Sequence, residues 1–78
     1  MENLNKETVE QTIMNVMNTI YGTTEGLTMD SNLEDLALKS LQIISISALL
    51  EEKLGYAPNF RSLINMKTLG EIRDYILK

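Results

Sequence analysis

With 78 residues, a net charge of −4 and neither cysteine nor histidine, the sequence excludes several classes of protein. Disulfide frameworks, Cys/His zinc sites, thiol nucleophiles and the commonest general base are ruled out, and the negative charge argues against nucleic acid and favours a basic protein surface as partner. No stretch approaches the ~20 apolar residues of a membrane span, and the N-terminus lacks the apolar run of a signal peptide. We therefore expect a cytoplasmic, monomeric protein with one domain over residues 1–78 and a frayed N-terminus at about residues 1–5.

The first element that the sequence predicts is a helix over residues 6–21. Asn5 is a suitable N-cap, Glu7 and Glu10 suit the positive end of the helix dipole, and Gly22 is typical of the position just past a helix end. Five apolar residues recur at helical spacing and predict one buried face: Val9, Ile13, Val16, Met17 and Ile20.

Residues 22–39 form a long connection that is rich in turn-forming residues. Connections of this length are usually functional or contain a short element, and Ser31-Asn32-Leu33-Glu34 has the pattern of a capping box. We therefore expect a helical turn over residues 32–36. Leucines should hold the loop to the core: Leu27, Leu33, Leu36 and Leu38. The acidic residues of the loop are either simply solvated or extend a surface that faces a partner: Glu25, Asp30, Glu34 and Asp35.

The stretch over residues 36–54 contains two apolar stripes. Ile44-Ser45-Ile46-Ser47 alternates as a strand would, but the pattern continues to Gly55, and this length favours a helix. On a helix, one stripe has the character of a core face with a single polar member: Ile43, Ile46, Ser47, Leu50 and Leu54.

The second stripe lies on a different face of the same helix and consists of Leu41, Ile44 and Ala48, bracketed by Glu51 and Glu52. An ordinary surface helix has a single apolar stripe. A second stripe edged with carboxylates predicts a docking patch for a basic, partly apolar partner. The alternative is that the helix is simply buried on two sides.

The last part of the chain predicts a short helix and a longer one. Pro58 prevents helix continuation and Asn59 can cap a short third helix. Apolar contacts are expected there from Phe60, Leu63, Ile64 and Met66. A second capping box, Thr68-Leu69-Gly70-Glu71, opens a final helix. Its apolar face should hold Leu69, Ile72 and Ile76, with Tyr75 beside it. The predicted fold class is therefore all-α: a four-helix bundle with three longer helices and one short helix.

The segment Asp30–Leu41 resembles the modification site of acyl carrier proteins, and the likeness covers roughly residues 9–76. In that family a polar or acidic turn leads through Leu-Gly-x-Asp to Ser-Leu. The serine opens the second helix and carries 4′-phosphopantetheine. Here Ala37 stands where the family usually has Gly, and Lys39 where it usually has Asp. The residues alone favour Ser40 as a plain exposed helix N-cap, and the resemblance is what favours the attachment site.

The resemblance implies that Ser40 carries 4′-phosphopantetheine, which a phosphopantetheinyl transferase supplies from coenzyme A. It implies a carrier rather than an enzyme, with acyl thioesters handled by loading, elongating or transferring enzymes of fatty acid, polyketide or related biosynthesis. An acyl chain would lodge in the interior against Ile43, Ile46 and Leu50. The docking surface would consist of Lys39, Leu41, Ile44, Ala48, Glu51 and Glu52.

Two other functions stay open: an aminoacyl or peptidyl carrier of a nonribosomal-type pathway, and an unmodified helical interaction module. An enzyme is disfavoured because neighbouring carboxylates, as in Glu51/Glu52, point in different directions on a helix, and the sequence contains no metal-ligand set or phosphate loop. Lys39 either selects a cognate transferase by its charge or reflects drift, with Ser40 taking over the cap.

Overall fold

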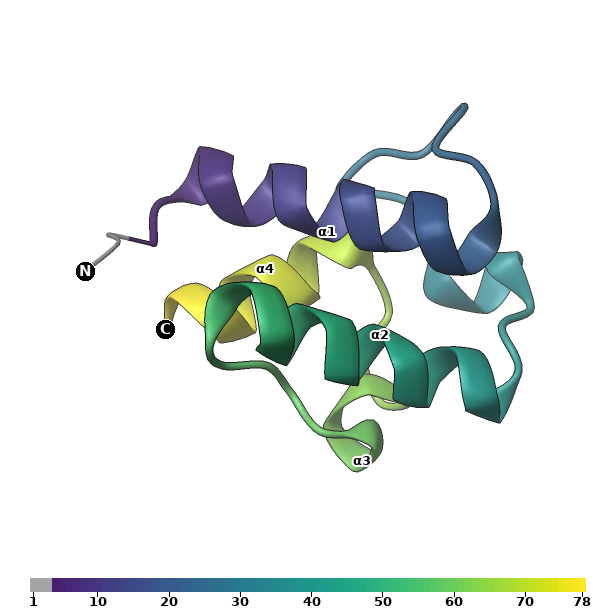
Figure 1. The fold of residues 1–78 in the computed structure, drawn as a ribbon. Helices are drawn as coiled ribbons and strands as arrows, with labels where there is room; N and C mark the ends of the chain where they lie inside the picture. Colours follow the sequence, from purple (N-terminus) through teal and green to yellow (C-terminus); the bar gives the residue numbers. More distant parts are fainter. Residues whose placement is uncertain (1–3) are drawn as a thin grey trace.

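The computed structural model describes residues 4–78, and helices form its framework (Figure 1). The elements, in chain order, are α1 (Lys6–Tyr21), the 3-10 turn η1 (Leu33–Leu36), α2 (Ser40–Leu54), α3 (Phe60–Leu63) and α4 (Leu69–Leu77). Within residues 4–78, strand-type pairing is limited to an isolated bridge between Asn32 and Thr68. The predicted all-α class, with three longer helices and one short helix, is confirmed. No helix of this part of the chain is long and apolar enough to cross a membrane.

Polar side chains begin most of the helices, as the sequence predicts. The Asn5 side chain accepts a hydrogen bond from the Thr8 amide at 2.8 Å, and Asn59 accepts one from the Ser62 amide at 2.9 Å. These bonds satisfy amides of the first turn that have no partner inside the helix. The predicted frayed segment lies mostly at residues 1–3, outside the described residues, whereas Asn5 at its end makes a well-formed cap.

Both predicted capping boxes differ in detail from the expected pattern. Asn32, and not Ser31, caps η1 by accepting from the Glu34 amide at 2.8 Å, while the Ser31 hydroxyl accepts from the Thr28 amide. At α4, Thr68 caps the Glu71 amide, but the Glu71 carboxylate reaches back to the amide of Lys67, one residue earlier than expected. At η1 the capping residue is shifted by one position, whereas at α4 the predicted cap forms and only the reciprocal hydrogen bond of Glu71 is shifted.

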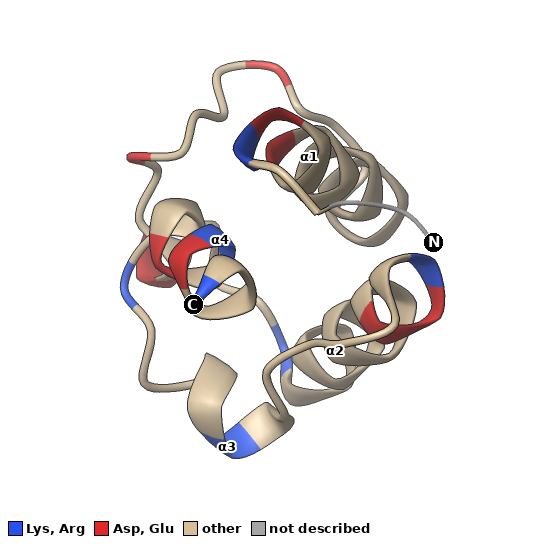
Figure 2. Cartoon of the chain, turned by 90° about the vertical axis from the view of Figure 1, so that its left-hand side faces the viewer, with Lys and Arg blue, Asp and Glu red and all other residues tan. Residues whose placement is uncertain are grey.

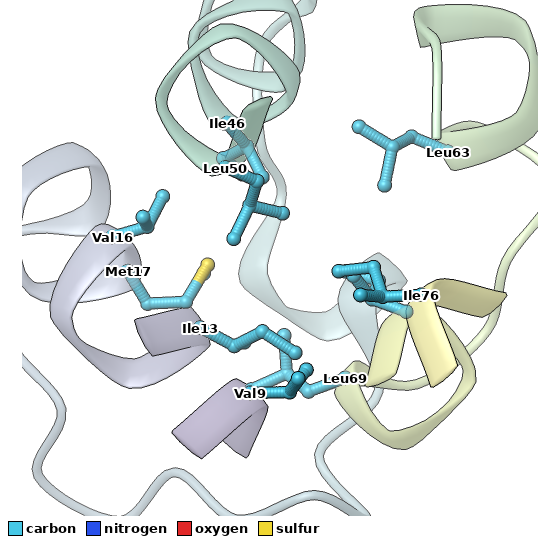
Figure 3. Close-up of a cluster of buried hydrophobic side chains, with 10 residues drawn as sticks. Val9, Ile13, Val16, Met17, Ile46, Leu50, Leu63, Leu69 and Ile76 are labelled. Atoms are coloured by element: carbon cyan, nitrogen blue, oxygen red, sulfur yellow. The ribbon is translucent and has the colours of Figure 1, made fainter. Parts of the chain in front are cut away.

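The core forms where the apolar faces of the four helices meet (Figure 3). α1 and α2 run antiparallel, α4 packs against α1, and α3 packs against α2 (Figure 1). The most deeply buried side chains are Val9, Ile13, Val16, Met17, Ile46, Leu50, Leu63, Leu69, Ile72 and Ile76. They include the predicted faces of the first and last helices, apart from Ile20, which is partly buried. Ile64 was expected to add an apolar contact, but it is half exposed.

The polar member of the α2 core stripe has a specific partner. The Ser47 hydroxyl donates a hydrogen bond to the Pro58 carbonyl at 2.7 Å. Because Pro58 is fully buried, its carbonyl would otherwise lack a donor in this tight segment between α2 and α3. A serine on the core face is therefore satisfied, as partly buried polar groups usually are.

The long loop is fixed to the beginning of α4 by backbone hydrogen bonds. The Leu33 amide donates to the Lys67 carbonyl at 2.7 Å, and the Gly70 amide donates to the Met29 carbonyl at 2.8 Å. A Cβ at position 70 would lie 3.0 Å from the same Met29 oxygen, so glycine permits this close approach. The four leucines predicted to hold the loop are all partly buried against the core. The loop thereby places η1 and the start of α2.

An ion pair ties the two ends of the chain together. The Arg73 guanidinium on α4 binds the Glu10 carboxylate on α1 and also Asp74 at 2.9 Å. The hydrogen bonds to Asp74 and Glu10 raise the pKa of Arg73 above its ordinary value. Arg73 and Glu10 are partly buried, with 19% and 30% of their side chains exposed, and their pair holds α4 against α1.

Candidate functional site

Ser40 is the first residue of α2 and is exposed to solvent. The residue before it, Lys39, has extended backbone angles and occupies the N-cap position, as predicted. Lysine has no acceptor atom, and no side chain caps this helix. The hypothesis that Ser40 takes over the cap is therefore wrong, because Ser40 already has helical geometry and its own backbone belongs to the first turn.

The start of α2 is held instead by Gln42. Its side-chain oxygen accepts a hydrogen bond from the Lys39 amide at 2.8 Å, and its side-chain nitrogen donates to the Ile20 carbonyl near the end of α1 at 3.3 Å. Gln42 therefore fixes the beginning of α2 against α1. Within residues 4–78, the first-turn amides of Ser40, Leu41 and Gln42 have no acceptor. They remain free to bind an anion, which the helix dipole also favours at this position.

Replacing Lys39 by aspartate is expected to stabilise the protein before any modification. A carboxylate at the N-cap accepts a first-turn N–H, worth about 0.5–2 kcal/mol, and it reverses an unfavourable charge near the helix dipole, worth about 0.3–1 kcal/mol. Each 1 kcal/mol raises the melting temperature by roughly 4–8 °C in a domain of this size. Thermal unfolding followed by circular dichroism measures the change. An unchanged melting temperature would mean that Lys39 does not limit the stability of this helix start.

Ala37 adopts a left-handed backbone conformation, with φ 52° and ψ 45°, at the end of η1. Within residues 4–78, it is the one residue other than glycine with a positive φ. Its amide donates to the Glu34 carbonyl at 3.1 Å and closes the turn. A residue with a Cβ pays about 1–2 kcal/mol in this conformation. The geometry explains why a glycine, usual at this position in the family that the sequence resembles, would fit more easily.

An Ala37→Gly variant is therefore expected to be more stable than the natural protein. Relief of the left-handed strain of about 1–2 kcal/mol exceeds the entropy that glycine adds to the unfolded chain, about 0.4–1 kcal/mol. Chemical denaturation measures the difference. The matched control is Ala48→Gly in the middle of α2, which should lose about 1 kcal/mol because its backbone is helical. If both variants lost stability equally, the strain at Ala37 would be disproved.

The second apolar stripe of α2 is exposed. Leu41 is 77% accessible and Ile44 47% accessible, and Ala48 is also exposed. The alternative that α2 is buried on two sides is therefore wrong. Glu51 and Glu52 are exposed at the far end of the helix. Lys53 follows them, so an acidic and a basic segment lie side by side at this end of α2 (Figure 2). The face is apolar near Ser40 and charged at the other end.

A cavity of about 730 Å³ lies between η1, α2, α3 and the segment before α4. Its walls include Ala37 and Leu38, the residues that lead into the start of α2. Of the predicted interior residues, Ile43 and Ile46 line this cavity, whereas Leu50 is fully buried in the core and is not part of its wall. Apolar residues that the sequence analysis did not assign to it complete the wall: Leu33, Leu38, Leu63, Ile64, Met66 and Ile72. The polar members are Asn32, Glu34, Asn65 and Lys67.

The additional wall residues could not be assigned from spacing on one helix. They come from η1, the residues just before α2, α3, the segment that joins α3 to α4, and α4 itself. In the sequence, these wall residues are recognisable only as apolar residues of short elements, such as Leu63 and Met66. The volume lies within the range of ~300–1,000 Å³ that is usual for small-ligand sites.

The residues around Ser40 fit a covalently attached phosphate ester. The hydroxyl is accessible, the adjacent first-turn amides are free, and Lys39 adds a positive charge at the same place. No catalytic base of the protein itself is needed for such an attachment when a separate enzyme makes the ester.

The comparisons with known proteins agree with this geometry. A family model described as a phosphopantetheine attachment site matches residues 11–76, which run from within α1 to near the end of α4. The comparison with curated proteins finds no match. The matched range contains Ser40, the cavity and the exposed stripe of α2. It agrees with the resemblance carried by Asp30–Leu41, and the cofactor of this kind of domain is covalent 4′-phosphopantetheine. The chain therefore belongs to the acyl carrier protein family of phosphopantetheine-binding domains.

Proposed function

We propose that this protein carries acyl groups as thioesters on a 4′-phosphopantetheine arm attached to Ser40. The observation that supports this assignment is the position of Ser40, exposed at an uncapped helix start inside the matched range. The attached group supplies the thiol, and the protein supplies its placement. Ser40 itself then acts as an anchor, and the chain is a substrate of other enzymes and not a catalyst.

The other serines are poorer candidates for attachment. The Ser31 hydroxyl already accepts a hydrogen bond from the Thr28 amide, and the Ser47 hydroxyl donates to the Pro58 carbonyl. Ser45 is partly buried within α2, and Ser62 is partly buried within α3. Ser40 combines an exposed side chain with a first-turn position.

The exposed stripe of α2 supports a role in docking partner enzymes. Leu41 and Ile44 offer apolar contact beside the attachment point, and Glu51 and Glu52 add negative charge further along. We propose that a phosphopantetheinyl transferase and the enzymes that load, elongate or transfer the acyl group bind this face. Their contact surfaces should be basic and partly apolar.

The cavity beside α2 supports an acyl chain as the cargo. Ile43 and Ile46 face a space that continues toward Leu63 and Ile72, so an apolar chain would exchange water for apolar surface there. An aminoacyl group would gain little from such walls. This favours a fatty acid, polyketide or related biosynthetic pathway over an aminoacyl or peptidyl one.

Co-expression with a phosphopantetheinyl transferase tests the carrier function directly. The intact mass should rise by one phosphopantetheine group per chain, and the rise should require the transferase. A chain that stays unmodified with an active transferase and coenzyme A would overturn the proposal in favour of an unmodified interaction module.

The cargo is tested by loading the modified protein with acyl chains of different length. A medium-length saturated chain should shift the methyl NMR signals of Ile43 and Ile46, whereas an acetyl group should not. The signals of Val9, buried on α1 away from the cavity, provide the internal control. Equal shifts with both loads would show that the chain does not enter the cavity.

A further inference from the structure

The segment between α2 and α4 differs in charge from the surface of α2. Residues 54–70 contain two basic side chains, Arg61 and Lys67, and neither aspartate nor glutamate, although the whole chain has a net charge of −4. In Figure 2, α3 and the segment that joins it to α4 accordingly show blue but no red. This side of the molecule is therefore basic, whereas Glu51 and Glu52 add negative charge at the far end of α2.

Arg61 and Lys67 are both exposed and have no carboxylate partner in the described part of the chain. The acidic residue closest to Arg61 in the sequence is Glu52, nine positions earlier. The Glu71 carboxylate accepts a hydrogen bond from the Lys67 backbone amide at 3.0 Å and forms no ion pair with the Lys67 ammonium. Glu34 lines the same cavity as Lys67 without pairing with it. Both positive charges are therefore available to a partner outside the chain.

An exposed apolar side chain lies on the same side of α3 as Arg61. Ile64 follows Arg61 by three residues, a spacing that places two side chains on one face of a helix, and it is 50% accessible while its neighbour Leu63 is buried. The Asn65 side chain donates to the Arg61 carbonyl at 3.1 Å. Ile64, Asn65 and Lys67 also line one cavity together. We call Arg61, Ile64, Asn65 and Lys67 the α3 patch.

We propose that the α3 patch is a second docking surface, whose partner is a protein segment that presents carboxylates around an apolar side chain. The carboxylates would bind the two free cations, and the apolar side chain would cover Ile64. A basic region that binds the α2 face would be repelled by the α3 patch, so the two surfaces receive different partner regions. This inference goes beyond the proposed function, because it concerns the bare chain and does not depend on attachment at Ser40.

The test titrates the unmodified protein with a helical peptide built from leucine and glutamate, followed by NMR. The signals of Ile64, Asn65 and Lys67 should shift, whereas those of Leu41 and Ile44 should not. The same peptide with glutamine in place of glutamate should bind several-fold more weakly, because its charge complementarity is lost. Raising the salt from 0.1 to 1 M shortens the Debye length from about 10 Å to about 3 Å. It should therefore weaken binding of the glutamate peptide.

Reversing the charge of the patch should remove most of the binding. Arg61→Glu combined with Lys67→Glu should weaken binding of the glutamate peptide by about tenfold or more, since like charges then face each other. The matched control is Lys6→Glu combined with Lys53→Glu, at exposed lysines of α1 and α2 that lie outside the patch. It changes the net charge equally and should bind the peptide much more tightly than the reversed patch.

The apolar part of the patch is tested by a pair of isoleucines with similar exposure. Ile64→Ala should weaken binding of the glutamate peptide several-fold. Ile44→Ala on α2, at a side chain that is 47% accessible, should not. Shifts confined to Leu41 and Ile44, or equal binding by the natural protein and the reversed patch, would overturn the proposal. Tighter binding of the patch to phosphatidylglycerol vesicles than to the peptide would overturn it in favour of a membrane surface.

Modification of the same variants separates this inference from the proposed function. The reversed patch should gain phosphopantetheine from a transferase at least as fast as the natural protein, because a basic enzyme on α2 is no longer repelled. Slower modification would show that the α3 patch belongs to the α2 docking surface and is no second one. If the natural protein gained no mass but bound the glutamate peptide at the patch, the proposed function alone would fail.

Discussion

Replacing Ser40 by alanine is expected to abolish the gain of phosphopantetheine completely while leaving the fold intact. The hydroxyl is the attachment atom, and no nearby serine has the same exposure at a helix start. The stability change should be small, because Ser40 is exposed and does not cap α2, and surface substitutions of this kind usually stay within about 0.5 kcal/mol. Intact mass after co-expression with a transferase measures the first effect, and circular dichroism the second.

The control for Ser40 is Ser45→Ala, one turn further along α2, which should be modified like the natural protein. A Ser40→Ala chain that still gained the group would refute the assignment and move attention to the remaining serines. If the Ser40→Ala chain did not fold, Ser40→Gly would serve as a second variant without the hydroxyl. The two variants differ only in helix propensity, by about 1 kcal/mol.

Replacing Leu50 by alanine is expected to cost about 2–5 kcal/mol of the free energy of unfolding, because its side chain is fully buried between the helices. Small domains lie toward the low end of about 5–15 kcal/mol in total stability, so this loss could leave the protein largely unfolded at physiological temperature. Chemical denaturation of the purified variant measures the change. Ile46→Ala should behave in the same way, since Ile46 is almost as deeply buried on the same face.

Truncation of a side chain on the exposed stripe should leave stability nearly unchanged and weaken partner binding instead. Leu41→Ala, at a side chain that is 77% accessible, should change stability by less than about 0.5 kcal/mol. It should nevertheless weaken transferase binding by about fivefold or more if Leu41 is a central docking contact, the effect of losing more than about 1 kcal/mol. Titration of the transferase with the unmodified protein measures this. Equal destabilisation by Leu41→Ala and Leu50→Ala would show that both stripes are core.

The sequence identified most of the local structure because helix starts, helix ends and apolar periodicity depend on residues within one or two turns. Asn5 and Asn59 cap the helices that their positions predicted, and Gly22 and Gly55 end α1 and α2 in the left-handed conformation. The separation of the α2 residues into a buried and an exposed stripe follows from the same geometry, since i, i+3 and i+4 neighbours share a face.

The shifted capping boxes show where local patterns stop being sufficient. Ser31 and Asn32 are both good caps, and the sequence could not distinguish them. The structure selects Asn32, because the bridge to Thr68 and the hydrogen bond from the Leu33 amide to Lys67 fix the backbone there. These partners lie more than thirty residues away along the chain.

What the sequence by itself determined is therefore the helices, the exposed and buried faces of α2, and Ser40 as the candidate attachment residue at its start. The tertiary structure decided which residues enclose the cavity, replacing Leu50 with Leu63 and Ile72 as partners of Ile46. It also decided that Ala37 adopts a left-handed conformation and that the Ser47 hydroxyl donates a hydrogen bond to the Pro58 carbonyl. The physical reason is that periodicity fixes the direction of a side chain from its own helix, whereas the groups that it meets depend on how distant segments pack.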